Sequence, residues 1–516
     1  MNTKQLRQKI LDLAIRGKLV PQDPNDEPAS VLLERILAEK ERLVKEGKIK
    51  RDKNESFIVR DSDRLHYEQL PDGSRKCIEN EIPFDVPDGW AWVRLNSMGQ
   101  IVGGGTPSTN NPSFWENGNI AWITPADLSG YAEKYIAKGG RNINDKGLAE
   151  SSAQIMPAGS VLFSSRAPIG YIAISANAVC TNQGFKSITP YILKINEYLY
   201  YYLTTRVEDI RSRASGTTFK EISGTEFGNT IVGIPPLAEQ RRIVTAIESA
   251  FAVIDEIERN KSDLQSAVAA AKSKILSLAI RGKLVPQDLD DDPASVLLER
   301  IRTEKESLIK TGKIKGDKNN SAIVRGDDNS YYQELPESWE QVFIGETHSI
   351  IRGITFPATA KQKSCADGVV SCVTTGSVQS KYNSLADVFI PECYVRNSAQ
   401  WLKYNDIIMS SANSRELVGK TCLWKEHTRK TFGGFLTVVR ASKHIFPTYS
   451  FFVLQYLWKS GAFIDSSTQT TNIANINNSI LASTSFPLPS LAEQRRIVAA
   501  IETAFEQLDN IAAMLE

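Results

Sequence analysis

Four short polar segments between residues 88 and 236 contain the residue types that bind phosphates and base edges. They read GGGTPSTNNPSFW (103–115), SSRAPIG (164–170), TNQGFK (181–186) and SGTTFKEI (215–222). Backbone N–H groups and short hydroxyls bind phosphate oxygens, whereas Arg pairs with guanine, and Asn or Gln with adenine, through two parallel hydrogen bonds. The segments predict a DNA-binding surface with the candidate residues Gly104, Thr106, Ser108, Ser164, Ser165, Arg166, Asn182, Gln183, Lys186, Thr217, Thr218 and Lys220.

Similar segments follow in the same order between residues 335 and 490. They read RGITFP (352–357), SSANSRE (410–416), TFGGF (431–435) and TQTTNIAN (468–475). A single residue of this kind is often only a turn former or a solvated side chain. The matching order in two otherwise dissimilar regions nevertheless favours a shared binding role. The candidates here are Arg352, Thr355, Ser410, Ser411, Asn413, Arg415, Thr470, Thr471 and Asn472.

The sequence contains no complete motif for common DNA-processing chemistry. The segment 111–114 (NPSF) lacks the second proline of an amino-methyltransferase motif. The segment 418–421 (VGKT) resembles the end of a phosphate-binding loop, but Ser414 stands where that loop needs its first glycine. The histidines fit neither a metal-binding helix nor a catalytic triad. We therefore expect no catalytic residues and no metal site in this chain.

Composition indicates an ordinary globular protein with little overall charge. The chain has 61 basic and 60 acidic residues, so a DNA-binding face must arise from local arrangement. The six cysteines form no Cys-x-x-Cys pair, which favours free buried thiols in a reducing compartment. The N-terminus has no apolar signal region, and no run of about 18 apolar residues exists. We expect a cytoplasmic location without a membrane partner.

An internal repeat organises the chain. Residues 11–54 and 276–319 are identical at 34 of 44 positions, and a second motif, LAEQRRIV, begins at Leu237 and again at Leu491. The regions between the repeats, 88–236 and 335–490, barely resemble each other. The repeated parts are therefore interpreted as spacers, and the variable parts as heads. Because the second spacer is divided between the two chain ends, the pattern is cyclic, and we expect neighbouring termini and a pseudo-two-fold axis.

The spacer is predicted to be a coiled-coil helix over about residues 237–281. Apolar residues alternate by four and three positions, as in a heptad seam that must be buried against a partner. The other copy is the obvious partner, and two-fold symmetry would make the pair antiparallel. A plain packing or dimerisation helix is the alternative. The predicted seam residues are Ile243, Ile247, Ile254, Ile257, Leu264, Val268, Ile275, Ile497, Ile501, Leu508 and Ile511.

A second, charged helix follows each spacer, with the sequence VLLERILAEKERLVKE (31–46) in the first copy. Its apolar residues, among them Leu32 and Ile36, could face a partner. The copies are also nearly identical at their polar positions, which either one partner bound twice or a recent duplication would explain. The polar stretches that follow, 51–87 and 316–334, are predicted to be extended linkers into the heads.

The sequence thus predicts an α+β protein in which two mixed α/β heads are joined by two long antiparallel coiled-coil spacers. Strands are expected at 160–165, 171–175 and 406–411, and helices at 196–214 and 449–461. The predicted boundaries are an N-terminal helical region (1–87), the first head (88–236), a central spacer with its linker (237–334), the second head (335–490) and a C-terminal spacer helix (491–516).

The chain resembles the specificity subunits of type I restriction–modification systems over nearly its whole length. PPLAEQRRIV (235–244), PSLAEQRRIV (489–498), the RGKLVPQ repeats, GGTPS (104–108), GSVLFSSRAPIG (159–170) and TNQGF (181–185) carry this resemblance. The second head departs from the pattern, because Phe432 and Gly433 align with Asn182 and Gln183.

The resemblance implies a non-catalytic, host-defence subunit whose two target-recognition domains each read one half of a bipartite, asymmetric DNA site. The helices would set the distance between the half-sites and dock two methyltransferase subunits. Restriction subunits would then complete a deoxyribonuclease and adenine-methyltransferase complex. No cofactor is expected in this chain, whereas S-adenosylmethionine, ATP and Mg are expected in the partner subunits. A structural coiled-coil adaptor and a methyltransferase that acts alone are the alternatives.

Overall fold

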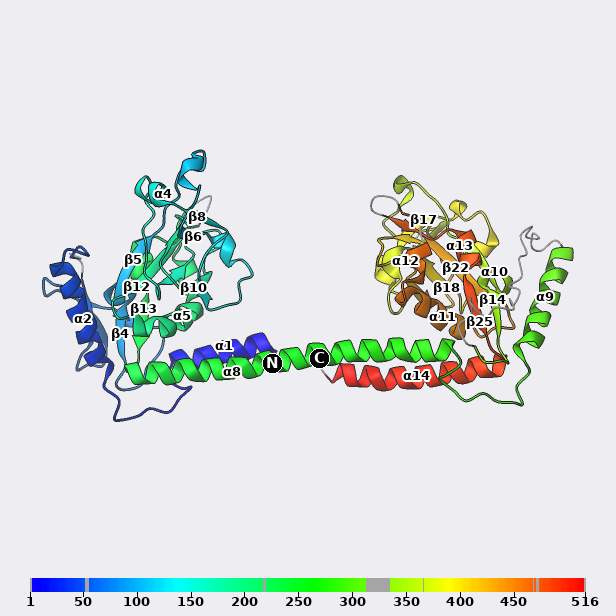
Figure 1. Cartoon of the computed structure of the whole chain (residues 1–516), viewed down its shortest axis with the longest axis horizontal. Helices are drawn as coiled ribbons and strands as arrows, with labels where there is room; N and C mark the ends of the chain where they lie inside the picture. Colours follow the sequence, from blue (N-terminus) through cyan, green and yellow to red (C-terminus); the bar gives the residue numbers. More distant parts are fainter. Residues whose placement is uncertain are drawn as a thin grey trace. The chain divides into compact units, whose positions relative to one another are not determined.

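The computed structural model describes residues 2–51, 55–216, 220–311, 335–364, 366–466, 468–469 and 473–514. It divides into two compact units, Met1–Arg259 and Asn260–Glu516. Each unit contains one predicted head, and the continuous helix α8 (Leu237–Ile280) contributes residues to both units (Figure 1). The mixed α/β character of the heads and the length of the central helix match the sequence-based predictions.

Unit 1 contains small mixed sheets that are covered by helices on the side of α8. Its other helices are α1 (Thr3–Ile15), α2 (Ala29–Lys45), α3 (Leu95–Met98), α4 (Asp145–Ala149), α5 (Asn196–Thr205), α6 (Val207–Ser212) and α7 (Gly224–Gly228). Its strands are β1 (Phe57–Arg60), β2 (His66–Gln69), β3 (Arg75–Cys77), β4 (Ala91–Arg94), β5 (Gly99–Gly103), β6 (Ile120–Ile123), β7 (Tyr135–Ile136), β8 (Arg141–Ile143), β9 (Val161–Phe163), β10 (Ile172–Ser175), β11 (Val179–Thr181), β12 (Lys186–Pro190) and β13 (Ile231–Ile234).

Unit 2 repeats this arrangement. Its other helices are α9 (Ala294–Lys310), α10 (Ile344–Thr347), α11 (Pro447–Lys459), α12 (Ala462–Ser466), α13 (Asn478–Ala482) and α14 (Leu491–Ala513). Its strands are β14 (Glu340–Phe343), β15 (His348–Arg352), β16 (Val369–Val373), β17 (Val388–Pro391), β18 (Ile407–Ser410), β19 (Ala412–Asn413), β20 (Thr421–Leu423), β21 (Thr431–Phe432), β22 (Leu436–Ala441), β23 (Thr468–Gln469), β24 (Ala474–Asn475) and β25 (Ser485–Leu488).

The two heads share the central part of their strand topology although their sequences barely resemble each other. Strand β7 has no counterpart in the main sheet of unit 2, and the small sheet β19-β24-β23 of unit 2 corresponds to isolated bridges in unit 1. The main sheet of unit 1 has the order β5-β12-β9-β10-β7, and that of unit 2 has β15-β22-β18-β20. The second sheets also correspond, with β11-β6-β8 in unit 1 and β21-β16-β17 in unit 2. In both, the strand before the polar turn pairs in parallel with the central strand of the second sheet. The polar segments of the two heads therefore occupy equivalent places.

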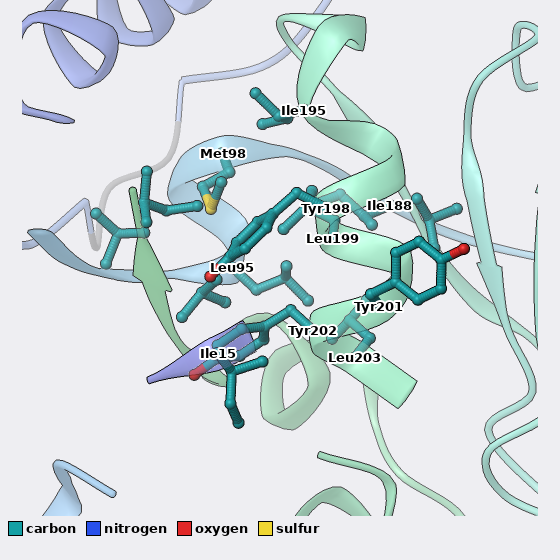
Figure 2. Packing of buried hydrophobic residues seen from close by; sticks show 14 of the residues in the cluster. Ile15, Leu95, Met98, Ile188, Ile195, Tyr198, Leu199, Tyr201, Tyr202 and Leu203 are labelled. Atoms are coloured by element: carbon teal, nitrogen blue, oxygen red, sulfur yellow. The ribbon is translucent and has the colours of Figure 1, made fainter. Parts of the chain in front are cut away.

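We call the repeated segments outside the heads the frame; its helices are α1, α2 and α8 in unit 1, and α8, α9 and α14 in unit 2. Helix α5 carries the core that joins head 1 to its frame, as Figure 2 shows. Tyr198 and Tyr202 are fully buried in a cluster that includes Ile15 of α1. The phenol of Tyr198 donates a hydrogen bond to the carbonyl of Gly233 (2.6 Å), and that of Tyr202 donates to Ile231 (3.1 Å). Because both acceptors lie on β13, the aromatic residues fix α5 against the strand that leads directly into α8.

A buried carboxylate joins the frame of unit 1 to its head. Glu239, in the first turn of α8, accepts hydrogen bonds from the Trp90 indole (3.0 Å) and from the Gln22 amide (2.7 Å). Arg242 in the next turn forms an ion pair with Asp26 at 2.7 Å. Burial raises the pKa of the Glu239 carboxyl above its ordinary value. We call this cluster the carboxylate junction of unit 1; it connects three segments that are distant in the sequence.

Unit 2 contains a matching carboxylate junction. Glu493 in α14 accepts hydrogen bonds from Trp339 (2.9 Å) and Gln287 (2.6 Å). Arg496 pairs with Asp291 at 2.7 Å. Burial again raises the pKa of the carboxyl. The identical residue types of the two repeats therefore form the same three-way contact twice.

Each half of α8 packs antiparallel against one piece of the divided spacer (Figure 1). In unit 1, Arg7 of α1 pairs with Asp255 (2.5 Å) and Glu258 (3.4 Å), while the end of α1 reaches the core around Ile243. In unit 2, Lys272 contacts Asp509 of α14. Most of the predicted seam is buried or half-buried, namely Ile243, Ile247, Ile254, Val268, Ile275, Ile497, Ile501 and Leu508.

The predicted burial of three seam residues is wrong. Ile257, Leu264 and Ile511 are 52%, 39% and 42% exposed. The ion pairs between helices end at Glu258 in unit 1 and resume at Lys272 in unit 2, so among the described residues no second helix covers Ile257 or Leu264 within its unit. A heptad pattern predicts which residues need a partner, but it does not predict how far the partner extends.

Two further predictions about the frame are corrected. The first predicted linker, 51–87, contains the antiparallel sheet β1-β2-β3, which Arg94 of β4 fixes through ion pairs of 2.8 Å with Glu68 and Glu81. The second, 316–334, lies entirely outside the described residues. The apolar face of α2 is covered by its own head rather than left for a partner, because Leu32 and Ile36 are buried in the unit 1 core.

The prediction of free buried thiols is confirmed for three cysteines. Cys180, Cys372 and Cys422 are buried and free, and burial raises the pKa of Cys180 to about 11. Cys77 and Cys393 are free but exposed, and Cys365 lies outside the described residues. Across the described ranges, no helix combines the length and apolarity that a bilayer crossing requires.

Substitution of Gly17 tests the close packing of the frame. Gly17 has a φ of +64°, and a Cβ there would lie 2.4 Å from Pro87. Gly47, which ends α2 with a φ of +71°, has nothing within 4 Å of such a Cβ. Left-handed backbone costs a non-glycine residue about 1–2 kcal/mol, and overpacking adds about 1–3 kcal/mol. We expect Gly17→Ala to lower the free energy of unfolding, measured in urea, clearly more than Gly47→Ala does; equal losses would contradict the packing argument.

The imidazole of His348 makes the stability of unit 2 depend on pH. It is buried between the Thr347 and Ser450 hydroxyls, 2.8 Å from each, and burial lowers its pKa from 6.5 to about 4. As pH falls below about 6.5 the unfolded chain gains a proton that the folded unit does not accept until about pH 4. The free energy of unfolding should therefore fall in this window by at most about 1.4 kcal/mol per pH unit.

We expect His348→Asn to be less stable at pH 7 but to lose less stability between pH 6.5 and 4, as measured by urea unfolding at each pH. Parallel stability curves for the two proteins would show that His348 does not cause the dependence.

Candidate nucleic-acid interface

The four polar segments of head 1 converge through backbone hydrogen bonds. Gly105 N–H donates to the carbonyl of Thr181 (2.9 Å), and Ser165 N–H donates to Gly184 (2.7 Å). Ile222 N–H donates in turn to the carbonyl of Ser165 (3.0 Å). The segments are separated in the sequence, but the ends of β5, β9 and β11 place them side by side.

The turn after β11 presents the predicted amide side chains. Gly104 allows this approach, because a Cβ there would lie 1.9 Å from the Asn182 carbonyl oxygen. The Asn182 side chain accepts a hydrogen bond from Gly184 N–H (2.9 Å), and the Thr106 hydroxyl donates to the Gln183 side chain. Asn182 thus shapes the turn, while the side chain of Gln183 is exposed, and an exposed amide of this kind can pair with a base edge.

A small charged cluster borders this turn. Glu221 lies 3.1 Å from the Lys186 ammonium and 3.9 Å from the Arg166 guanidinium, and the exposed Lys220 precedes it. The cations can bind phosphate or guanine, and a carboxylate can accept a hydrogen bond from the cytosine amino group. Sequence reasoning missed Glu221, although its place directly after Lys220 in a polar segment was a usable signal.

Some candidates of head 1 are not placed to contact DNA. Ser164 and Ser165 are buried, and the Ser164 hydroxyl donates to the Pro168 carbonyl and accepts from Tyr171 N–H, both at 2.8 Å. These serines hold the loop, so their position does not support direct contact. Ser108 is exposed, and its carbonyl accepts a hydrogen bond from the Trp115 indole within the 103–115 loop (3.2 Å). Thr217 and Thr218 lie outside the described residues.

Head 2 repeats the same backbone connections. Ile354 N–H donates to the Phe432 carbonyl (2.9 Å), Ser411 N–H to Phe435 (3.0 Å), and Ile476 N–H to Ser411 (2.8 Å). These bonds match those of head 1 one for one. The equivalence of the four segments, which their order in the sequence predicted, is therefore confirmed.

The register of the third segment differs by one residue from the sequence-based alignment. Asn182 N–H donates to the Ile123 carbonyl (3.0 Å), and it is Gly433 N–H that makes the equivalent bond to Val373 (2.9 Å). Gly433 and Gly434 therefore stand in place of Asn182 and Gln183, while Phe432 is buried one position earlier. Strand pairing sets this register, and a glycine-rich segment carries too few side chains to reveal it.

Among the described residues of head 2, the charged cluster of head 1 has no counterpart. Ala412 pairs with Asn475 where Arg166 pairs with Glu221. In the main sheet of head 2, Arg352 of β15 pairs with Thr437 of β22. The equivalent pair in head 1 is Gly103 of β5 and Lys186 of β12, so the basic residue stands on the other strand of the pair. The two heads consequently present different chemistry from the same backbone.

Head 2 has a cavity of about 810 Å³ where its polar segments meet. Predicted candidates Arg352, Thr355 and Ser411 line it, together with the glycine pair 433–434. Ser410 is buried and accepts a hydrogen bond from the Asn413 amide (3.0 Å), which does not support contact with DNA. Arg415 is exposed beyond the cavity; Thr470, Thr471 and Asn472 lie outside the described residues.

No metal-binding cluster of three or more His, Cys, Asp or Glu residues occurs in the part of the chain that the structure describes.

Two heads of one topology, each with converging polar turns and each carried on a repeated helical frame, define a class of paired recognition subunits. The family model described as the type I restriction modification DNA specificity domain matches residues 87–264 and 336–515. The chain belongs to this family and is a DNA specificity subunit of the type I restriction–modification kind.

Curated relatives and a solved structure agree with this assignment. The specificity subunit of the Escherichia coli type I restriction enzyme EcoEI is 28% identical over 99% of this chain and 91% of the relative. The MjaIX specificity subunit of Methanocaldococcus jannaschii is 38% identical over 36% of this chain and 43% of the relative. A chain solved in work on assembly and conformational transition of the type I R-M system has a TM-score of 0.55 at 19% identity, covering 84% of this chain and 94% of that one. At that identity the structural likeness shows the fold alone.

A matched pair of glycine substitutions tests the turn of head 1. A Cβ at Gly104 would displace the 181–184 turn, whereas a Cβ at Gly103 meets nothing within 4 Å. One lost bidentate base contact costs about 1–3 kcal/mol of discrimination. We expect Gly104→Ala to weaken specific DNA binding about 5- to 150-fold in a salt-controlled titration of the assembled complex, and Gly103→Ala to leave it nearly unchanged. Equal binding by both variants, with equal melting temperatures, would exclude the turn from recognition.

Proposed function

We propose that each head reads one half of a bipartite, asymmetric DNA site. The observation that carries the proposal is that the two heads share one backbone arrangement of their polar segments but have different side chains there. Equivalent turns present Asn182 and Gln183 in one head and Gly433 and Gly434 in the other. Two readers with the same frame and different contact residues are suited to two different half-sites.

The spacer helices are proposed to form a coiled-coil ruler. Antiparallel packing of α1 and α14 against α8 supports this, as does the length of α8, about 65 Å for 44 residues at about 1.5 Å each. Half-sites about one helical turn of DNA apart, or about 34–36 Å, would fall within such a length. Neighbouring termini and a pseudo-two-fold relation of the halves remain part of the proposal.

The partners are proposed to be double-stranded DNA, two methyltransferase subunits and, through them, the restriction subunits. The solvent-facing polar sides of α2 and α9, which are nearly identical in sequence, are surfaces on which one kind of partner could bind twice. Catalysis would belong to those partners, and so would S-adenosylmethionine, ATP and Mg. The whole complex would then act in the cytoplasm.

Exchange of one head tests the modular proposal. Residues 88–236 would be replaced by the corresponding head of a relative with another specificity, and genomic methylation would be mapped in cells that express the methyltransferase. We expect exactly one half of the methylated sequence to change, because each head has its own core and its own turns. A change in both halves, or in neither, would contradict the proposal.

The purified chain serves as the control for the alternatives. Methyl transfer to DNA by this chain and S-adenosylmethionine alone would indicate an enzyme. Absence of any sequence preference after addition of the methyltransferase would instead indicate a structural adaptor, provided that the salt-dependent background is subtracted.

A further inference from the structure

The recognition surface of head 2 is a recess where that of head 1 projects side chains. The glycine pair 433–434 lines the cavity of about 810 Å³, at the positions that Asn182 and the exposed Gln183 occupy in head 1. The major groove of DNA is about 8.5 Å deep, so its base edges are reached by side chains that protrude. The glycine pair cannot extend a side chain into the groove, but the recess can accommodate a group that leaves the duplex.

The wall of the cavity is already formed. Behind it, the Asp387 carboxylate accepts hydrogen bonds from Ser371 (2.9 Å), Ser377 (2.8 Å), the Tyr382 phenol and the Lys430 ammonium (3.0 Å). Asp387 lies between the cavity-lining residues Ala386 and Val388. This network fixes that wall without any ligand, which lowers the ordering cost of binding.

The lining combines flat apolar groups with hydrogen-bonding groups and cations. Ile354, Phe356 and Phe435 supply apolar surface, and Arg352 and Lys361 supply positive charge. No carboxylate occurs among the described lining residues, whereas threonines and asparagines are frequent. A polyanionic ligand with a flat polar ring, such as a nucleobase on its phosphate backbone, matches this chemistry.

The backbone of Phe435 is fixed by hydrogen bonds, whereas the residue is exposed to solvent. Its carbonyl accepts hydrogen bonds from Ser411 N–H (3.0 Å), Ala412 N–H (3.2 Å) and the Ser411 hydroxyl (3.2 Å), yet the residue is 64% exposed. Head 1 has the buried Gly184 at this position, where its carbonyl accepts the equivalent bond from Ser165. The aromatic ring is therefore a feature of head 2 alone.

We propose that the cavity of head 2 receives one nucleobase that leaves the DNA stack, and that the ring of Phe435 stacks on it. The proposal rests on the DNA-reading function above and adds an asymmetry: the half-site of head 2 is unstacked at one position, whereas head 1 reads an intact duplex edge. Recognition would combine stacking with hydrogen bonds from the lining polar groups.

The experiment uses the full chain, alone and with its methyltransferase subunits, on a duplex that contains its methylated site. 2-Aminopurine, whose fluorescence rises when it is unstacked, replaces one base at a time in both half-sites. We expect a rise at one position of the head 2 half-site with the chain alone. Phe435→Ala should remove the rise and weaken specific binding about 5- to 150-fold, the range for loss of one base–aromatic stack.

Two further variants make the result specific. Gly433→Asn adds the amide side chain of head 1 to the cavity lining, and a Cβ there makes only ordinary contacts, the nearest 3.6 Å from the Val373 carbonyl, so the fold should persist. It should abolish the fluorescence rise. Leu385→Ala removes an apolar side chain that is 93% exposed and does not line the cavity, and it should change nothing.

Sequence-specific binding without a fluorescence rise at any position of the head 2 half-site would overturn the inference and leave the proposed function intact. A rise that persists in Gly433→Asn would also overturn it, because the base would then occupy another place. Failure of the proposed function would differ from both, since neither half-site would then be preferred over random DNA.

Discussion

The buried carboxylates Glu239 and Glu493 impose the constraint on which the two units depend. Each accepts one hydrogen bond from a head tryptophan and one from a glutamine of the preceding repeat, and each lies in the first turn of a spacer helix. In unit 2, loss of the acceptor would leave the buried Trp339 indole N–H unsatisfied, at about 1–3 kcal/mol. The half-buried Trp90 and the exposed glutamines could bond to water instead. The loop before α2 or α9, the start of the spacer helix and the head are therefore tied at one point. A head can be varied only if its first tryptophan continues to meet this junction.

Away from the carboxylate junctions, the polar segments of the two heads have the same backbone arrangement but different side chains. The hydrogen bonds that link the four polar segments are the same in both, since they join main-chain groups that any residue supplies. Side chains at equivalent positions differ in charge, size and shape: Arg166 against Ala412, and Gly184 against Phe435. The side chains that differ between the heads are therefore not the groups that hold the segments together. This explains how two sequences with little resemblance share one strand order, and how a chain of nearly neutral net charge can still offer basic groups at a chosen place.

In the spacer helices, the apolar pattern of the sequence does not predict how far the packing between helices extends. Apolar spacing along α8 marks residues that need to be covered. Ile243 and Ile247 are covered by α1 and the head, and Ile254 is also buried. Ile257 and Leu264 are not covered within their units. The charged faces of the helices contribute little to stability on their own, because exposed ion pairs are worth at most about 1 kcal/mol. Packing of α5 and α11 against the frame, centred on buried tyrosines such as Tyr198 and Tyr449, supplies the larger apolar contact.

The sequence by itself determined the two-fold repeat, the long central helix, the positions of the main strands and the family, because repetition and hydrophobic period are local properties of the chain. It also placed the four polar segments of each head in order, including Gln183 and Arg166. Only the tertiary structure decided that Ser164 and Ser165 face inward, that Gly433 rather than Phe432 is the counterpart of Asn182, that residues 57–77 form a sheet, and that Glu221, Phe435 and the cavity belong to the site. Burial and strand register arise from contacts between residues far apart in the chain, and a short polar segment carries no local signal of which neighbours will cover it.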